Sequence, residues 1–336
     1  MLRKILTLFF VFLATMAWSQ DLHFTHYNKN PLYINPALAG KFAGKYKMML
    51  ISRDQWSTVS VPYKSFGAMV EASSLAGKSP LGTALSLYRD VAGDSRFTTT
   101  KVDIGASYTV PINYNRSSVI TFGLQGGLHH YGLDYSKLQF DNQYTEESGF
   151  NPGLPARENF NQTAVLSPAA SAGVAFLKQA GRYTVVAGVG AYNLLQGDLG
   201  FTRQGVDDVQ QQIRLNYYLS VEYLMGKVVL VPSFLRTQSS VLHETIIGME
   251  ARYQPQDRSP EFSLGTMYRF QDALALTVGI NYSPWEIGFS YDINTSTLYR
   301  ASRGYGAIEV FLSYIIQPTN QRVSEKNRFQ VCPSFI

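Results

Sequence analysis

The sequence predicts an all-β chain that folds as a transmembrane, antiparallel outer-membrane β-barrel of about 14 strands. Three observations support this prediction: an export leader at the N-terminus, apolar residues that recur with period two, and polar strand faces made of small or uncharged residues. An N-terminal extended arm precedes the predicted barrel, and a C-terminal periplasmic tail follows it.

The composition fits a folded, exported chain. Of 336 residues, 16% are charged, which is well below the roughly 25% of an average soluble domain. The apolar share of 45% argues against disorder. The single cysteine, Cys332, excludes an internal disulfide framework and a cysteine-cluster zinc site. The net charge of +5 becomes +3 without Arg3 and Lys4 of the leader, and no basic stripe with interleaved aromatics indicates a nucleic-acid partner.

Residues 1–19 have the pattern of a signal peptide. A basic start (Met1–Lys4) precedes an apolar stretch (Ile5–Trp18), and small residues at Ala17 and Ser19 predict cleavage before Gln20. An N-terminal membrane anchor is the alternative, but the apolar run is shorter than the ~20 residues that a spanning helix needs. No other segment approaches 18 consecutive apolar residues, which excludes a helical membrane protein.

Most of the remaining chain alternates between apolar and polar residues. In Trp285–Ile293, for example, every second residue is apolar, while the residues between them are polar or small. This alternation predicts strands centred near residues 49, 68, 85, 104, 124, 173, 187, 218, 231, 248, 265, 278, 289 and 311. Strands of about ten residues suit a transmembrane barrel, whose closed sheet satisfies every backbone group in lipid.

The chemistry of the two strand faces distinguishes a barrel from a soluble sandwich. A sandwich turns its polar face to water and usually carries many Lys and Glu there, whereas here that face is mostly small or uncharged. Aromatic residues recur near the predicted strand ends, where a membrane-interface girdle would lie, although strand propensity alone also favours them. The girdle candidates are Trp56, Tyr108, Tyr183, Tyr223, Tyr268, Tyr282 and Trp285.

Connection lengths define the predicted ends and domains. With both termini periplasmic, short turns and long loops should alternate. The short set is Pro111–Arg116, Lys178–Arg182, Met225–Lys227, Gln254–Ser259 and Ser283–Pro284, and the long set is Tyr131–Thr163, Leu195–Gln210 and Asn294–Gly304. Phe270–Asp272 is short where a long loop is expected, which a miscounted strand would explain. The predicted domains are the arm (20–44), the barrel (45–316) and the periplasmic tail (317–336).

We expect no catalytic, cofactor-binding or metal-binding residues. His23 and His26 have no nearby third ligand in sequence, and His129 and His130 point to opposite strand faces. A calcium loop from Asp292 would need Gly at Thr297 and Glu at Arg303. Gly188 and Gly190 are not followed by a crossover helix, so we interpret them as wall glycines that permit bending or make space for an aromatic ring.

Sequence motifs in the arm and the first strand resemble a known family. The motifs are Asp21-x-x-Phe24-Thr25-x-Tyr27, Asn30-Pro31, Asn35-Pro36-Ala37-x-Ala39-Gly40, Arg53-Asp54-Gln55-Trp56 and Pro62-x-x-Ser65. They resemble those of the PorP/SprF family of the Bacteroidetes type IX secretion system, with Thr25 for the usual Ser and Asp54 for the usual Asn. The ending Cys332-Pro333-Ser334-Phe335 is also similar, with Ser334 for the family's Arg.

The resemblance implies an integral outer-membrane barrel that assists type IX export. Family members support the secretion or surface attachment of partner adhesins, including gliding adhesins, and associate with periplasmic parts of the machine. The corresponding candidates for partner docking or for a structural motif are Phe24, Tyr27, Asn30, Pro31, Asn35, Pro36, Arg53, Gln55 and Trp56. We expect the arm to line the periplasmic mouth or lumen and to help dock partners, and the alternative is a plug without a partner.

Two other functions stay open at this stage. The first is a porin-like or hydrophobic-substrate transport channel, which the small inward residues permit. The second is a soluble exported β-sandwich or solenoid adhesin.

Overall fold

A computed structural model describes residues 23–58, 61–73, 80–93, 95–145, 149–151, 153–155, 162–201, 210–240, 242–256 and 259–317. The predicted signal peptide, and the predicted tail beyond Gln317, lie outside the described residues. No helix among these residues is both long enough and apolar enough to cross a membrane.

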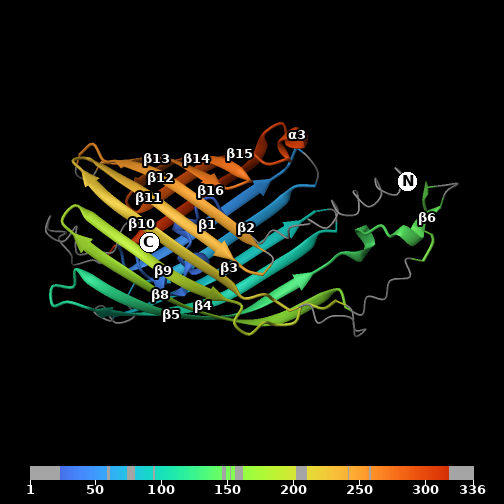
Figure 1. The fold of residues 1–336 in the computed structure, drawn as a ribbon, viewed down its shortest axis with the longest axis horizontal. Helices are drawn as coiled ribbons and strands as arrows, with labels where there is room; N and C mark the ends of the chain where they lie inside the picture. The colour runs from blue at the N-terminus through green and yellow to red at the C-terminus, as the bar shows by residue number, and fades with distance from the viewer. Residues whose placement is uncertain are drawn as a thin grey trace, which may run out of the picture.

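Fourteen antiparallel strands form a closed barrel, which confirms the predicted fold (Figure 1). Each strand pairs with its neighbours in the chain, and pairs such as Tyr46 with Ile316 close the barrel between its first and last strands. All fourteen predicted centres fall within observed strands. The strands are β1 (Tyr46–Gln55), β2 (Tyr63–Ala72), β3 (Leu81–Ala92), β4 (Phe97–Pro111), β5 (Ser118–Gly132), β8 (Ala164–Ala180), β9 (Tyr183–Tyr192), β10 (Arg214–Met225), β11 (Val228–Gln238), β12 (His243–Tyr253), β13 (Glu261–Arg269), β14 (Ala273–Tyr282), β15 (Trp285–Asn294) and β16 (Tyr305–Ile316).

The two strand faces differ as the alternation predicts. On β16, the apolar side chains of Ile308 and Val310 are 49% and 44% exposed, whereas Glu309 and Ser313 are completely buried. Because successive side chains of a strand point to opposite faces, the exposed apolar set lies on the outer wall and the polar set lies in the lumen. The barrel therefore has an apolar outer face, as a lipid-embedded barrel requires, while its inner face carries the buried polar and charged residues together with apolar side chains that pack on the arm.

One end of the barrel, which we call the turn end, carries short connections and both barrel termini. The β8–β9, β10–β11 and β14–β15 connections are two residues each. An outward aromatic belt lies at this end, with ring contacts between Tyr183 and Tyr223 at 4.7 Å and between Trp285 and Tyr314 at 4.6 Å. The expected girdle residues Tyr108 and Tyr282 also lie at this end.

The opposite end, the loop end, carries the long connections (Figure 1). Tyr268 lies here on the outer face, and Trp56 lies in the β1–β2 connection against Tyr63. The β5–β8 connection bears two helical turns, η3 (Tyr135–Lys137) and η4 (Asp141–Gln143), and a small hairpin, β6 (Tyr144–Thr145) with β7 (Gly149–Phe150), that stands away from the barrel wall. The β15–β16 connection holds the short helix α3 (Tyr299–Ser302).

The short connection at Phe270–Asp272 is real and does not come from a miscounted strand. It joins β13 to β14 at the loop end, where the β3–β4 and β11–β12 connections are also only four residues long. The expectation that every loop-end connection is long was therefore wrong, because a tight turn can close a hairpin at either end of a barrel.

Candidate functional site

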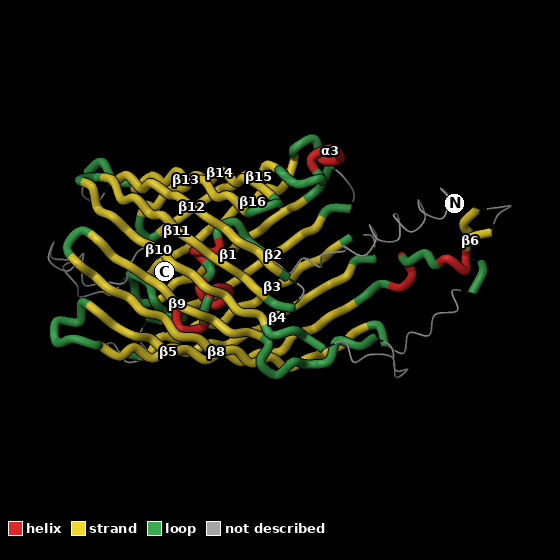
Figure 2. The backbone as a smooth tube through the Cα atoms, in the orientation of Figure 1, coloured by secondary structure: helices red, strands yellow, loops and turns green. Residues whose placement is uncertain are grey.

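The N-terminal arm lies inside the barrel. It forms three short helical turns, η1 (Tyr27–Lys29), α2 (Pro31–Ile34) and η2 (Pro36–Leu38), which Figure 2 shows in red within the ring of strands. From Phe24 to Gly40 every residue except Asn28 is buried. The described part of the arm thus occupies the lumen as a plug, consistent with the luminal position that the sequence analysis allows.

The path of the plug follows from its contacts. It starts near the loop end, where the His23 ring approaches the Arg53 guanidinium at 3.3 Å. It reaches the turn end at Lys29, whose ammonium bonds Glu286 of β15 at 2.5 Å. The plug then crosses to β10, where the Asn216 amide donates to the Tyr33 and Ile34 carbonyls. It returns along β5, β4 and β3 to β1.

A first ionic cluster holds the start of the plug. We call Arg53 of β1, Asp292 of β15 and Glu309 of β16 the loop-end clamp. Arg53 donates to the Thr25 hydroxyl at 2.8 Å, and it also pairs with Asp292 at 2.8 Å and with Glu309 at 3.3 Å. Glu309 in turn accepts from the backbone N–H groups of Thr25 at 2.8 Å and His26 at 2.7 Å.

The two carboxylates of this clamp have further hydrogen-bond donors and a further cation beside them. Glu309 also contacts the His26 ring at 2.8 Å, and Asp292 accepts from the Thr25 hydroxyl at 2.9 Å. A second cation, Arg269 of β13, lies 3.4 Å from Asp292. Burial of charges is costly unless they are paired and hydrogen-bonded, and here each carboxylate of the clamp has several donors.

A second ionic cluster, the turn-end clamp, consists of Lys29, Lys47, Glu71 and Glu286. Besides the Lys29–Glu286 pair, Lys47 of β1 pairs with Glu71 of β2 at 3.2 Å. Glu71 also accepts from the backbone N–H of Gly40 at 3.0 Å. Both ends of the plug are therefore tied to the wall by buried charges.

The two Asn-Pro steps shape the middle of the plug. Pro31 and Pro36 each occupy the first turn of a short helix, where the missing N–H costs nothing. The Asn35 side chain caps η2 by accepting from Ala37 N at 2.8 Å, and it donates to the Val174 carbonyl of β8 at 2.9 Å. Asn30 similarly accepts from the Tyr88 hydroxyl of β3. Asn35 thus fixes both a local turn and a contact with the wall, whereas the Asn30 side chain contributes a wall contact alone.

Glycines on the inner wall let the backbone of the plug approach closely. A Cβ at Gly123 of β5 would overlap the backbone of Pro36 and Ala37, and one at Gly82 of β3 would overlap the Ala39 carbonyl. Gly188 leaves room for the Tyr218 ring, as the sequence predicts, whereas Gly190 leaves room for the Ile34 carbonyl. The wall therefore has a surface that accommodates the plug.

The structure brings together most of the candidate site residues. Phe24, Tyr27, Asn30, Pro31, Asn35 and Pro36 are buried in the plug, and Arg53 holds its first residues. Phe24 packs on Tyr88 with ring centroids 6.0 Å apart. Gln55 is buried at the loop end of β1, and Trp56 follows it with a left-handed φ of 60° and its backbone N–H bonded to Gly306. Their burial leaves the plug residues little surface for direct contact with another protein.

Sequence reasoning missed the wall residues that hold the plug. These residues are Glu71, Asn216, Glu286, Asp292 and Glu309. The alternation identifies them as inward and polar, but gives no partner for them. His23 and His26 contact Arg53 and Glu309, and the described residues contain no group of three or more potential metal ligands.

Comparisons with known proteins agree with this architecture. Solved structures similar in fold include the CymD monoaromatic hydrocarbon channel (9% identity, 85% of this chain and 92% of that chain, TM-score 0.51). A TodX deltaS2S3 mutant monoaromatic hydrocarbon channel is also similar (11% identity, 84% of this chain and 93% of that chain, TM-score 0.52). At such identities the likeness concerns the fold alone. A search of curated protein sequences gave no match.

The family comparison is more specific. The model for the type IX secretion system membrane protein PorP/SprF matches residues 17–314, a range that includes both the plug and nearly all of the barrel. The plug with its two clamps and the closed 14-stranded wall are thus features of a chain that belongs to the PorP/SprF family of type IX secretion system membrane proteins.

Proposed function

We propose that this chain is an integral outer-membrane accessory of type IX secretion, exported by its signal peptide, that supports the export or surface anchoring of a partner adhesin of the gliding type. The observation that carries the proposal is the family match over residues 17–314. On this proposal the chain is not an enzyme and needs no cofactor, and it also docks periplasmic components of the machine.

The position of the plug suggests how its motif residues contribute. Because Asn30, Asn35 and Arg53 are buried and hydrogen-bonded to the wall or the arm, they act on partners by keeping the arm in place. Partners then contact the surfaces left open: the loops at the loop end and the turns at the turn end. This refines the expectation that the arm helps to dock partners.

The test is a secretome and surface-proteome comparison between a clean deletion and its parent strain. Loss of one or a few large surface proteins, with the other type IX cargo intact, is the expected result for a dedicated accessory. Loss of all type IX cargo would indicate a core component instead. Unchanged cargo would refute the secretion role.

Complementation of the deletion strain with plug variants tests whether the plug contributes to export. A double variant, Asn35→Ala with Pro36→Ala, removes the η2 cap and the first-turn proline. Expression of a heat-modifiable, folded barrel that no longer supports export would support a role of the plug in export. Normal export by that folded variant would rule out any contribution of this motif to docking.

The alternative function is a porin-like or hydrophobic-substrate transport channel. The fold shared with hydrocarbon channels is compatible with it, but transport through the lumen would require the plug to leave. Planar-bilayer recordings distinguish the two functions. An accessory with a closed lumen shows little conductance until residues 23–44 are deleted, whereas a working channel conducts with the arm present.

A further inference from the structure

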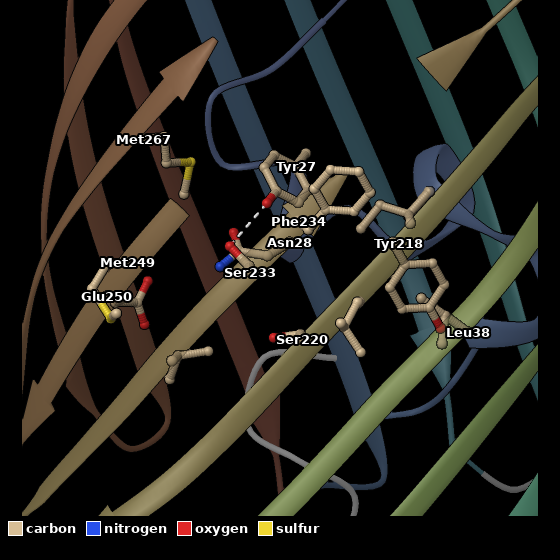
Figure 3. A pocket seen from close by; sticks show the side chains of 13 residues that line it. Tyr27, Asn28, Leu38, Tyr218, Ser220, Ser233, Phe234, Met249, Glu250 and Met267 are labelled. Atoms are coloured by element: carbon tan, nitrogen blue, oxygen red, sulfur yellow. Dashed lines mark hydrogen bonds between the residues drawn. The ribbon is translucent and has the colours of Figure 1, made fainter. Parts of the chain in front are cut away.

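A cavity lies between the plug and the wall strands β10 to β13 (Figure 3). The plug contributes Tyr27, Asn28, Ile34 and Leu38, and the remaining lining residues come from the four strands. Most of these side chains are apolar, and among the wall residues are two methionines, Met249 and Met267, whose unbranched side chains adapt to irregular shapes. The cavity thus has the mixed character of a site for a largely apolar ligand.

Two buried oxygens at the cavity have no hydrogen-bond partner. The Tyr218 side chain is 8% exposed, and its hydroxyl bonds to nothing among the described residues. The side-chain oxygen of Asn28 is in the same situation. By contrast, the neighbouring Tyr27 hydroxyl donates to Ser233 at 3.1 Å (Figure 3). Since a buried polar group without a partner is costly, each of these oxygens would be stabilised by a hydrogen-bonding group in the cavity.

The barrel wall is interrupted beside this cavity. The β10–β11 ladder pairs Ser220 with Ser233 and resumes only where Tyr223 pairs with Leu230. Pro232 lies in the gap, and it has no N–H to donate. The other side of β11 remains paired there, since Pro232 stands opposite Met249 of β12. The break therefore affects only the β10–β11 seam, although proline is normally confined to edges and bulges of sheets.

The seam faces the membrane. Leu219, Phe234 and Met249 line the cavity, yet their side chains are 44%, 37% and 47% exposed on the outer wall. The cavity is thus separated from lipid by one layer of strands, at a place where that layer lacks backbone pairing. An apolar molecule in the membrane can reach it without crossing water.

The charge of the side chains that line the cavity favours a neutral ligand. Glu250 is the charged side chain among the lining residues, and it pairs with Arg252 at 3.2 Å. An additional carboxylate beside Glu250 would be repelled, so a neutral headgroup is favoured over a fatty-acid anion. A hydroxyl group meets the demand of the Tyr218 hydroxyl, because it can accept a hydrogen bond from it.

We propose that this cavity binds a single alkyl chain bearing a hydroxyl group, which enters from the membrane at the break in the β10–β11 ladder. The site is independent of the proposed role in secretion, because it rests on the cavity, its unsatisfied oxygens and the seam alone.

The experiment uses the full-length protein in nanodiscs and dodecan-1-ol carrying a photoreactive diazirine. We expect saturable labelling of peptides from the plug and from β10–β13, and unlabelled dodecan-1-ol should compete better than dodecane. Tyr218→Phe keeps the ring and removes the hydroxyl, so the advantage of the alcohol should fall about threefold to tenfold, the loss of one hydrogen bond.

Three further variants complete the test. Leu38→Trp fills the cavity and should abolish saturable labelling, whereas Leu264→Trp, on the lipid-facing side of β13, should not. Pro232→Val restores a backbone donor and should slow labelling. Non-saturable labels spread around the outer wall, or an alcohol preference that Tyr218→Phe leaves intact, would overturn the site. Labelling of Pro232→Val at the parental rate would overturn the proposed route.

Discussion

Replacement of Arg53 by Met should release the start of the plug. The Arg53 side chain is 1% exposed and bonds one hydroxyl of the plug and two wall carboxylates. Methionine keeps most of the volume but leaves Glu309 and Asp292 without their shared cation. Removal of one partner of a buried ion pair typically costs about 3–5 kcal/mol, because the other charge stays buried.

That cost translates into a large shift in population. Since every 1.4 kcal/mol is a factor of ten, about 3–5 kcal/mol raises the fraction of molecules with a released plug by about 140-fold to 3,700-fold. The lower value is the better estimate here, because Arg269 still lies 3.4 Å from Asp292.

Cysteine accessibility measures this shift. In a Cys332→Ser background, Leu38→Cys places a thiol at a plug position that is 4% exposed in the native protein. We expect slow maleimide labelling with Arg53 present and much faster labelling in Arg53→Met. Arg89→Met, an outward-facing substitution on β3, serves as the matched control. If Arg53→Met forms a heat-modifiable barrel whose Leu38→Cys thiol labels at the control rate, the clamp does not hold the plug.

The remaining predictions are measured by labelling of Leu38→Cys or by urea titration. Gly123→Ala should expel the plug and speed labelling of Leu38→Cys, because its Cβ would overlap Ala37. Gly126→Ala on the same strand has room for a Cβ and should leave the labelling rate unchanged. Lys29→Met isolates Glu286 and should lower the free energy of unfolding by about 3–5 kcal/mol in urea titrations, against less than about 0.5 kcal/mol for Lys227→Met at an exposed turn. Asn216→Leu leaves the Tyr33 and Ile34 carbonyls without their side-chain donor and should cost about 1–3 kcal/mol in the same titration; an unchanged midpoint would show that water replaces the amide.

The strands of the barrel are predictable from the sequence because the alternation that defines each strand lies within that strand. Each strand must present alternate residues to lipid, so a stretch such as Trp285–Asn294 shows its period and both faces without reference to any other segment. Connection lengths are less constrained, since a hairpin can close in two residues or carry a long insertion at the same end. For that reason Phe270–Asp272 departs from the expected pattern while the strands beside it do not.

The plug is not predictable in the same way, because its contacts join residues far apart in the chain. Glu309 is recognisable as an inward acid on β16, but nothing local indicates that it accepts from Thr25 and His26, more than 280 positions away. The Asn-Pro steps indicate turns and exclude a long helix, yet they do not indicate that Asn35 also donates to Val174. The sequence therefore defines the local shape of the arm but not the wall surface against which it packs.

The distribution of charge suggests why the plug combines ionic ends with an apolar middle. Apolar contacts such as those of Phe24 and Leu32 favour burial, but they tolerate a shift of the chain by a residue or two. The clamps do not tolerate such a shift. Glu309 accepts from two consecutive N–H groups and Lys29 pairs with Glu286, so a slip of one residue breaks both sets of contacts. Buried ion pairs add little net stability compared with apolar replacements, so we infer that the clamps fix the register of the plug. Replacement of the Lys29–Glu286 pair by Met and Leu should then leave stability nearly unchanged while broadening the positions that Leu38→Cys samples, and a stable variant with a single, native labelling rate would contradict this interpretation.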